Sequence, residues 1–127
     1  MSAQPFRIKS VLALGLDPAV VDLSEFPELT PELVRAFIDS QLERLRSLGY
    51  EVDSCLVDLG ETAEAVLTQH LASHRFDVVL IGAGLRAQNQ LLLFERLLNL
   101  VHAKAPDAKI CFNTTPADSA EAVQRWT

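Results

Sequence analysis

Small, polar and charged residues follow four short apolar runs of this 127-residue chain, and chemistry would be placed among them. The candidate site residues are Asp17, Gly82, Gly84, Arg86, Asn113 and Thr114. Ligands of open parallel sheets bind beyond the carboxyl ends of the strands. Backbone N–H groups at the two glycines would hold an anionic group that Arg86 neutralises, and Asp17 would act as a base or bind a hydroxyl. We therefore expect a small anionic ligand there and leave catalysis open, although the same residues are typical of ordinary turns and caps.

One glycine turn resembles a dinucleotide-binding motif. Gly82-Ala83-Gly84-Leu85-Arg86-Ala87 matches G-x-G-x-x-A between an apolar run and an expected helix. About 40 residues follow it, and the next strand ends in Asn113 instead of an acidic residue that would bind a ribose. These departures argue against a complete NAD(P) site and favour a smaller anion on the same loop. The cofactor is left unknown.

Other familiar chemistries lack a required residue. A phospho-aspartate receiver domain needs an aspartate where Gly82 stands, and no P-loop sequence occurs. His70 and His74 have a metal-compatible spacing without the glutamate of a zinc protease, so we expect an exposed helix face. Asp17 and Asp58 would end neighbouring strands and could hold a hard cation, but turn and cap roles are the preferred interpretation. No metal site is expected.

Composition narrows the partners. The net charge of −6 argues against nucleic acid and anionic membranes, since both require a basic face. No apolar run is long enough to cross a bilayer and no signal peptide is visible, so a cytoplasmic location is expected. Cys55 and Cys111 lie within apolar runs and are interpreted as small buried hydrophobic residues.

The elements that would position these residues alternate along the chain. Strands are expected at 8–16, 50–57, 77–81 and 109–113. A helix is expected to begin at Thr30-Pro31 and to stop at Gly49, and further helices are expected at 61–73, at 88–104 and after Pro116. Thr30-Pro31 and Thr115-Pro116 are typical helix starts, and Asp118 would complete a capping box.

This alternation predicts an α/β fold, with residues 1–127 as a single domain. The expected architecture is a three-layer α/β/α sandwich around a doubly wound, four-stranded parallel sheet, flavodoxin-like or Rossmann-like. The preferred strand order is 2-1-3-4, and 3-2-1-4 is the alternative. Glu51 and Asp53 indicate that the second strand lies at an edge.

Two segments carry more apolar residues than their positions require. The expected helix at 88–104 is apolar around much of its circumference, which predicts self-association. The interface would include Leu92, Phe94, Glu95, Asn99 and His102. The connection at 16–29 is long and apolar, and we expect it to pack against the domain. A scaffold or regulatory protein acting through the helix surface is therefore the alternative to ligand binding.

Four segments carry a wider resemblance: VLALGLDPAVVDLSEFP, VVLIGAGLR, LLLFERLLNLVHAKAPDAKICFNTTP and AVQRW. Together they span Val11 to Trp126, and they resemble a family of small bacterial and fungal α/β proteins. The resemblance implies a flavodoxin-like or Rossmann-like fold. It implies no particular activity and assigns no functional residue.

Overall fold

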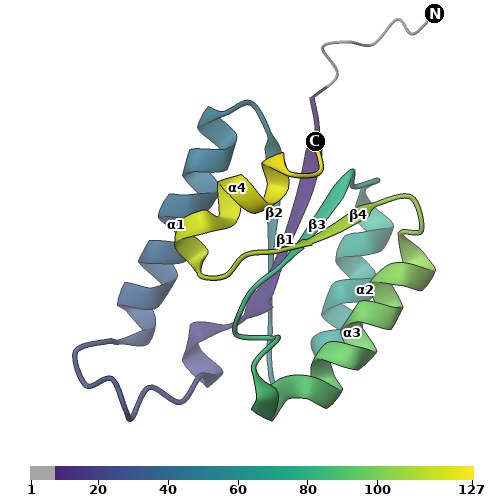
Figure 1. The fold of residues 1–127 in the computed structure, drawn as a ribbon. Coiled ribbons are helices and arrows are strands. Elements are labelled where there is room, and N and C mark those ends of the chain that lie inside the picture. The colour runs from purple at the N-terminus through teal and green to yellow at the C-terminus, as the bar shows by residue number, and fades with distance from the viewer. Residues whose placement is uncertain (1–7) are drawn as a thin grey trace, which may run out of the picture.

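A computed structural model describes residues 8–127 and contains a four-stranded, all-parallel sheet (Figure 1). The strands are β1 (Ser10–Leu16), β2 (Glu51–Val57), β3 (Val78–Ile81) and β4 (Lys109–Phe112). Their order is β2-β1-β3-β4. The preferred order is confirmed, and the alternative 3-2-1-4 is wrong. Strand β2 is an edge strand, as its charged residues predicted.

Four α-helices cover the sheet: α1 (Pro31–Ser47), α2 (Ala63–Ser73), α3 (Leu91–Lys104) and α4 (Ser119–Gln124). Helices α1 and α4 lie together over one face, and α2 and α3 lie together over the other (Figure 1). Strand side chains alternate between the two faces. Val11 and Ala13 of β1 therefore pack on the α1–α4 side, while Leu12 and Leu14 pack on the α2–α3 side. The doubly wound α/β/α architecture is confirmed.

Local sequence determines where the helices begin. The Thr30 side chain accepts a hydrogen bond from the Leu33 N–H, and Pro31 occupies the first position of α1. At the other end of the chain, Thr115 and Asp118 form the predicted capping box. There the chain first makes a 3₁₀ turn, η3 (Pro116–Asp118), and continues into α4. Gly49 follows α1 with a φ of 99°, a conformation that favours glycine.

Two further 3₁₀ turns lie where the sequence predicted a plain loop and the first turn of a helix. They are η1 (Pro18–Val20) and η2 (Gln88–Gln90). The connection at 16–29, which contains η1, only partly meets its expectation. Val20 and Val21 pack against the core, but Phe26 and Leu29 are exposed. The expectation that its whole apolar spine packs down is therefore wrong. No helix in the described residues has the length and hydrophobicity needed to span a membrane.

Candidate functional site

A cavity of about 200 Å³ lies on the α1–α4 side of the sheet, over the carboxyl ends of the strands. Its floor comes from the strands and the turns that follow them, and its far wall is the inner side of α1. The lining residues are Ala13, Leu14, Gly15, Leu16, Pro18, Val21, Val34, Ile38, Gln41, Leu42, Ser54, Leu56, Leu80, Gly82, Ala83, Gly84, Asn113, Pro116 and Ser119. This is the edge where the sequence predicted a ligand.

Small residues on the floor leave this space open. Gly15, Ser54 and Gly82 occupy positions on the floor of the cavity. Most buried positions elsewhere in the sheet carry large apolar side chains. Glycine is not required by the backbone at Gly82 or Gly84, because only Gly49 and Gly60 have positive φ among the described residues. An added Cβ would lie 3.5 Å from the Leu14 carbonyl oxygen at position 82 and 3.7 Å from Leu16 Cδ1 at position 84. Both are ordinary contact distances, so packing does not demand glycine either.

Gln41 is the unusual side chain of the cavity wall. Its Oε1 atom is buried and is the one buried side-chain polar atom of the described chain with no hydrogen-bond partner. Buried polar groups are almost always hydrogen-bonded, and an unsatisfied one costs about 1–3 kcal/mol. Gln41 shares the inner side of α1 with Ile38 and Leu42, which also line the cavity. It was absent from the predicted site, and the signal that could have identified it is a glutamine on an otherwise apolar helix face.

Asn113 is almost fully buried and joins three parts of the site. Its Oδ1 accepts a hydrogen bond from the Ala83 N–H at 3.0 Å, and its Nδ2 donates to Ser119 Oγ at 3.1 Å. Asn113 thus links the turn after β3 to the beginning of α4. Its amide holds the floor of the cavity in place with both of its ends engaged.

Arg86 lies behind the cavity and is not among its lining residues. Its guanidinium donates to the Ile81 and Asn113 carbonyl oxygens and to Asn113 Oδ1, and it stacks 4.9 Å from the ring centroid of Phe112. Burial lowers the pKa of Arg86, while the charge of Asp118 opposes that shift. In this arrangement Arg86 clamps the ends of β3 and β4 together.

The other two predicted site residues are engaged in local turns: Asp17 caps η1, and Thr114 bonds the carboxylate of the capping box. Asp17 Oδ1 accepts a hydrogen bond from the Ala19 N–H at 2.9 Å and pairs with Arg35 of α1. Thr114 Oγ1 donates to Asp118 Oδ2 at 2.6 Å. Neither residue lines the cavity. Of the six predicted residues, the structure places Gly82, Gly84 and Asn113 at the cavity and the other three around it.

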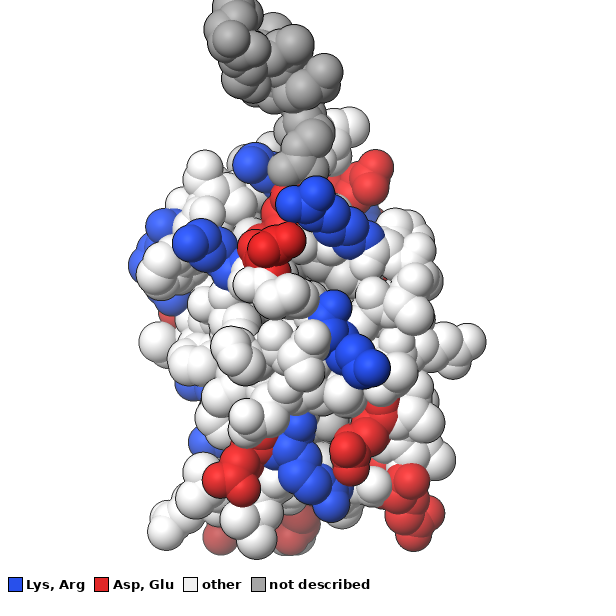
Figure 2. Space-filling model, turned by 90° about the vertical axis from the view of Figure 1, so that its right-hand side faces the viewer, with Lys and Arg blue, Asp and Glu red and all other residues white. Residues whose placement is uncertain are grey.

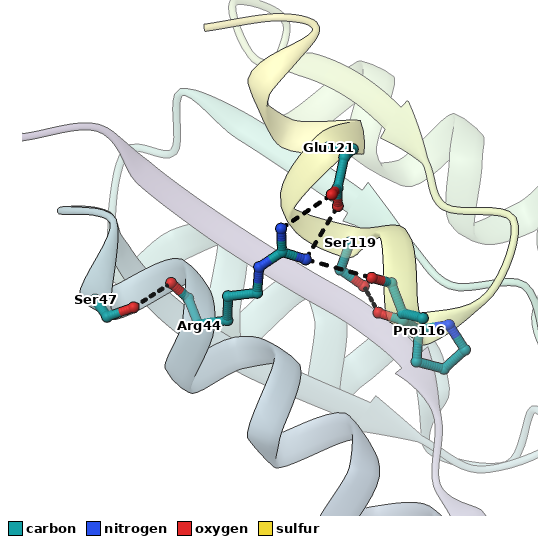
Figure 3. A network of polar contacts seen from close by, with 6 residues as sticks. Arg44, Ser47, Pro116, Ser119 and Glu121 are labelled. Carbon is teal, nitrogen blue, oxygen red and sulfur yellow. Dashed lines mark hydrogen bonds and ion pairs between the residues drawn. The ribbon is translucent and has the colours of Figure 1, made fainter.

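An arginine clamp fixes α4 beside α1 at the edge of this site (Figure 3). Arg44 donates to both carboxylate oxygens of Glu121, at 3.2 and 2.9 Å, and to the Ala117 carbonyl oxygen. The Arg44 hydrogen bonds lower the pKa of Glu121. Ser119 Oγ donates to the Pro116 carbonyl oxygen at 2.7 Å, which closes the turn before α4. Pro116 and Ser119, the two cavity-lining residues of this turn, are thus held to each other, while Arg44 holds the turn and α4 to α1.

The remaining reactive side chains lie elsewhere. Cys55 and Cys111 are buried, and loss of hydration raises the pKa of their thiols to about 12 and about 11. Asp58 accepts hydrogen bonds from Gly60 and Thr62, whose side chain is the main reason that its pKa is lowered. His74 lies beyond the end of α2 and stacks on Phe76, so it does not share a helix face with His70. No cluster of three metal-binding side chains occurs in residues 8–127.

Helix α3 exposes less apolar surface than its sequence predicted for the interface. Leu98 and Leu100 pack against the core, and Phe94 meets the ring of Phe112 edge-on. Leu91 and Leu92 remain exposed at the beginning of α3. Figure 2 views the molecule from the α2–α3 side, where acidic and basic side chains are interspersed. The self-association surface is thus reduced to the first turn of α3, and it stays a prediction.

These features define a Rossmann-like α/β domain with a cavity at the carboxyl edge of its sheet. No protein-family model matches the sequence, and no curated protein matches it significantly. Among solved structures, the structure of this chain is similar to that of a cobalamin-dependent S-adenosylmethionine radical enzyme, OxsB, with aqua-cobalamin bound. The TM-score is 0.50 at 18% identity, over 94% of this chain and 16% of the enzyme. The chain thus spans about a sixth of that enzyme, and the similarity supports the Rossmann-like fold implied by the resemblance above.

Proposed function

We propose that this domain binds a small, largely apolar molecule in the cavity, through a hydrogen bond donated to Gln41. The unsatisfied Gln41 Oε1 is the observation that carries the proposal. Because Oε1 itself is buried, the Gln41 side chain would turn toward the cavity, where a ligand N–H or O–H group would supply the missing partner and recover the free energy that the buried oxygen now costs. Most of the other lining residues are apolar, which suits a ligand with one polar group and a hydrocarbon body.

The cavity limits the size of this ligand. A dry apolar cavity of roughly 150 Å³ accommodates benzene, so about 200 Å³ suits a single substituted ring. The glycines of the floor support this interpretation, because neither backbone conformation nor packing requires them at positions 82 and 84. Their missing side chains preserve space that a methyl group would take.

Binding is a better account of this cavity than acid–base catalysis. Among the described lining residues there is no acidic, basic, cysteine or tyrosine side chain. The sequence predicted an anionic ligand. The site supports binding of a small molecule, but it gives less support to a negative charge on that molecule. Arg86 would have to leave its carbonyl partners to reach an anion, and the Ala83 N–H is already engaged by Asn113.

Cobalamin, which the structural neighbour binds, does not fit this cavity as a whole. A corrin macrocycle with its side chains greatly exceeds about 200 Å³. The described histidines lie on the α2–α3 side of the sheet, away from the cavity, so none of them is placed to ligate a metal there. The proposal therefore concerns a smaller molecule.

The test is a screen of single-ring compounds by thermal shift and ligand-observed NMR. Phenols, anilines and azoles carry a donor, and their O-methyl, N,N-dimethyl and N-methyl analogues, respectively, serve as matched compounds without one. The proteins are the wild type, Gln41→Leu, and the control Gln69→Leu, which changes an exposed glutamine of α2. We expect donor compounds to raise the Tm of the wild type and of Gln69→Leu, since selective binding to the native state stabilises it.

Gln41→Leu should bind the donor compounds at least tenfold more weakly than the wild type, a loss of about 1.4 kcal/mol in binding free energy. Two results would contradict the proposal. One is a set of donor compounds that bind Gln41→Leu as tightly as the wild type. The other is a screen in which no ring compound binds the wild type at millimolar concentration.

A further inference from the structure

The negative charge of this protein is confined to one stretch of the chain. Residues 17–43, from the end of β1 through most of α1, contain seven acidic residues and one arginine. The other 100 residues contain ten acidic and ten basic residues and are neutral overall. The whole net charge of −6 therefore belongs to this acidic segment, defined here as residues 17–43.

Most of these carboxylates are free of ion pairs. Asp17 pairs with Arg35, and Glu43 pairs with Arg46. No ion pair within the described residues involves the other five, all of which are exposed. They are Asp22, Glu25, Glu28, Glu32 and Asp39.

The acidic segment also exposes large apolar side chains. Leu33 and Phe37 are 56% and 43% exposed, and they are one turn apart on the outer side of α1. Leu29 lies four residues earlier in the sequence, immediately before the Thr30 cap, and is 39% exposed. Phe26 is 50% exposed and is joined to it by a turn in which the Leu29 N–H bonds the Phe26 carbonyl oxygen. We call Phe26, Leu29, Leu33 and Phe37 the apolar row.

We propose that the apolar row and its carboxylates form a docking surface for a basic amphipathic helix of another protein. The apolar row would take the apolar side of that helix, and the carboxylates beside it would meet lysine or arginine residues along its flanks. The alternation of exposed apolar and acidic residues along 25–39 matches this chemistry.

Charge decides between this partner and the other occupants of an apolar surface. A twofold dimer through the apolar row would place the acidic segment against its own copy, and like charges facing each other destabilise an interface. Nucleic acids and anionic lipid surfaces would be repelled in the same way. The α2–α3 side, where the signs are mixed (Figure 2), offers no comparable attraction for a basic helix.

The surface is separate from the cavity although both use α1. Leu33 and Phe37 lie on the outer side of α1, whereas Val34 and Ile38 line the cavity. Substitutions in the apolar row thus test docking alone. The probe is a synthetic peptide of ~18 residues, about five helical turns, with leucines on one side and lysines on the other. Binding of its fluorescent form is followed by anisotropy.

Two pairs of double variants decide the outcome. Leu33→Ser/Phe37→Ser should weaken peptide binding about tenfold, whereas Leu91→Ser/Leu92→Ser, on exposed leucines of α3, should leave it unchanged. Glu28→Lys/Glu32→Lys should weaken binding and reduce its salt dependence, whereas Glu61→Lys/Glu95→Lys should do neither. All changed side chains are exposed, and circular dichroism would confirm that each variant is folded.

Four results would overturn the proposal. The first is wild-type protein that does not bind the peptide even at low salt. The second is equal loss of affinity in the test and control variants, which would show attraction to net charge only. The third is a wild-type dimer that is broken by Leu33→Ser/Phe37→Ser. The fourth is binding of the wild type to vesicles of anionic lipid.

Discussion

In the free protein, Gln41 lacks a hydrogen-bond partner that a bound ligand would supply. Its side chain is held among Ile38, Leu42 and other apolar groups, yet its Oε1 has no partner. A leucine there would lose no hydrogen bond through that oxygen and would leave no buried carbonyl oxygen without a partner. The glutamine therefore lowers the stability of the free protein while providing a specific contact for a ligand, a compromise typical of binding sites.

We expect Gln41→Leu to raise the free energy of unfolding of the free protein by about 1 kcal/mol. Urea denaturation at neutral pH measures this change, with Gln69→Leu as the control at an exposed position. A Gln41→Leu variant that is less stable than the wild type would show that the glutamine makes a favourable contact in the fold. In that case the argument for a ligand donor at this position would be lost.

At the level of single elements, helix caps could be predicted from the sequence, whereas contacts between distant segments could not. Thr-Pro starts and the Thr115–Asp118 capping box are local signals, since the atoms that satisfy each other lie within three residues, and they were predicted. The Arg86 clamp depends on where β4 ends in space, 27 residues away, and was not. The cavity itself results from the packing of α1 and α4 over small floor residues, which no local pattern encodes.

The capping box also predicts a response to acid. Hydrogen bonds, first from the Thr114 side chain, hold the pKa of Asp118 below its ordinary value of 3.8. Because the pKa is lower in the folded state than in the unfolded state, the stabilisation is complete above 3.8 and is lost as the pH falls through the folded value.

We therefore expect the Tm of the wild type to fall more steeply below about pH 4 than that of Asp118→Asn. Scanning calorimetry over this range would measure the difference. Asp107→Asn, at an exposed aspartate between α3 and β4, is the control and should follow the wild type. Parallel curves for wild type and Asp118→Asn would mean that the capping carboxylate contributes nothing to stability.

The whole molecule is asymmetric in charge and in exposed apolar surface. The acidic segment lies on the α1 side, while the exposed leucines of α3 lie in a region of mixed charge on the other side. Self-association through α3 is therefore compatible with docking of a basic helix at α1. The sequence predicted a larger α3 surface because hydropathy cannot show that Leu98 and Leu100 are covered by the neighbouring elements.

For the assembled molecule we predict a dimer that depends on the first turn of α3. Leu92 is 73% exposed, and Leu92→Glu would place a charge in that contact. Size-exclusion chromatography with light scattering should show a wild-type dimer and a Leu92→Glu monomer, with Leu48→Glu at the end of α1 behaving like the wild type. A wild type that is monomeric at its highest soluble concentration would remove α3 as an interface.

Helix α1 forms the cavity wall on one side and carries the apolar row on the other. A ligand in the cavity and a basic helix on the apolar row would both contact α1. Binding of one could therefore change the affinity for the other, by an amount called the coupling free energy. If a ring compound at Gln41 changes the affinity for a basic helix by some factor, thermodynamic reciprocity requires that helix to change the affinity for the compound by the same factor. A seventeen-residue helix would thus let a small metabolite and a protein partner each report the presence of the other.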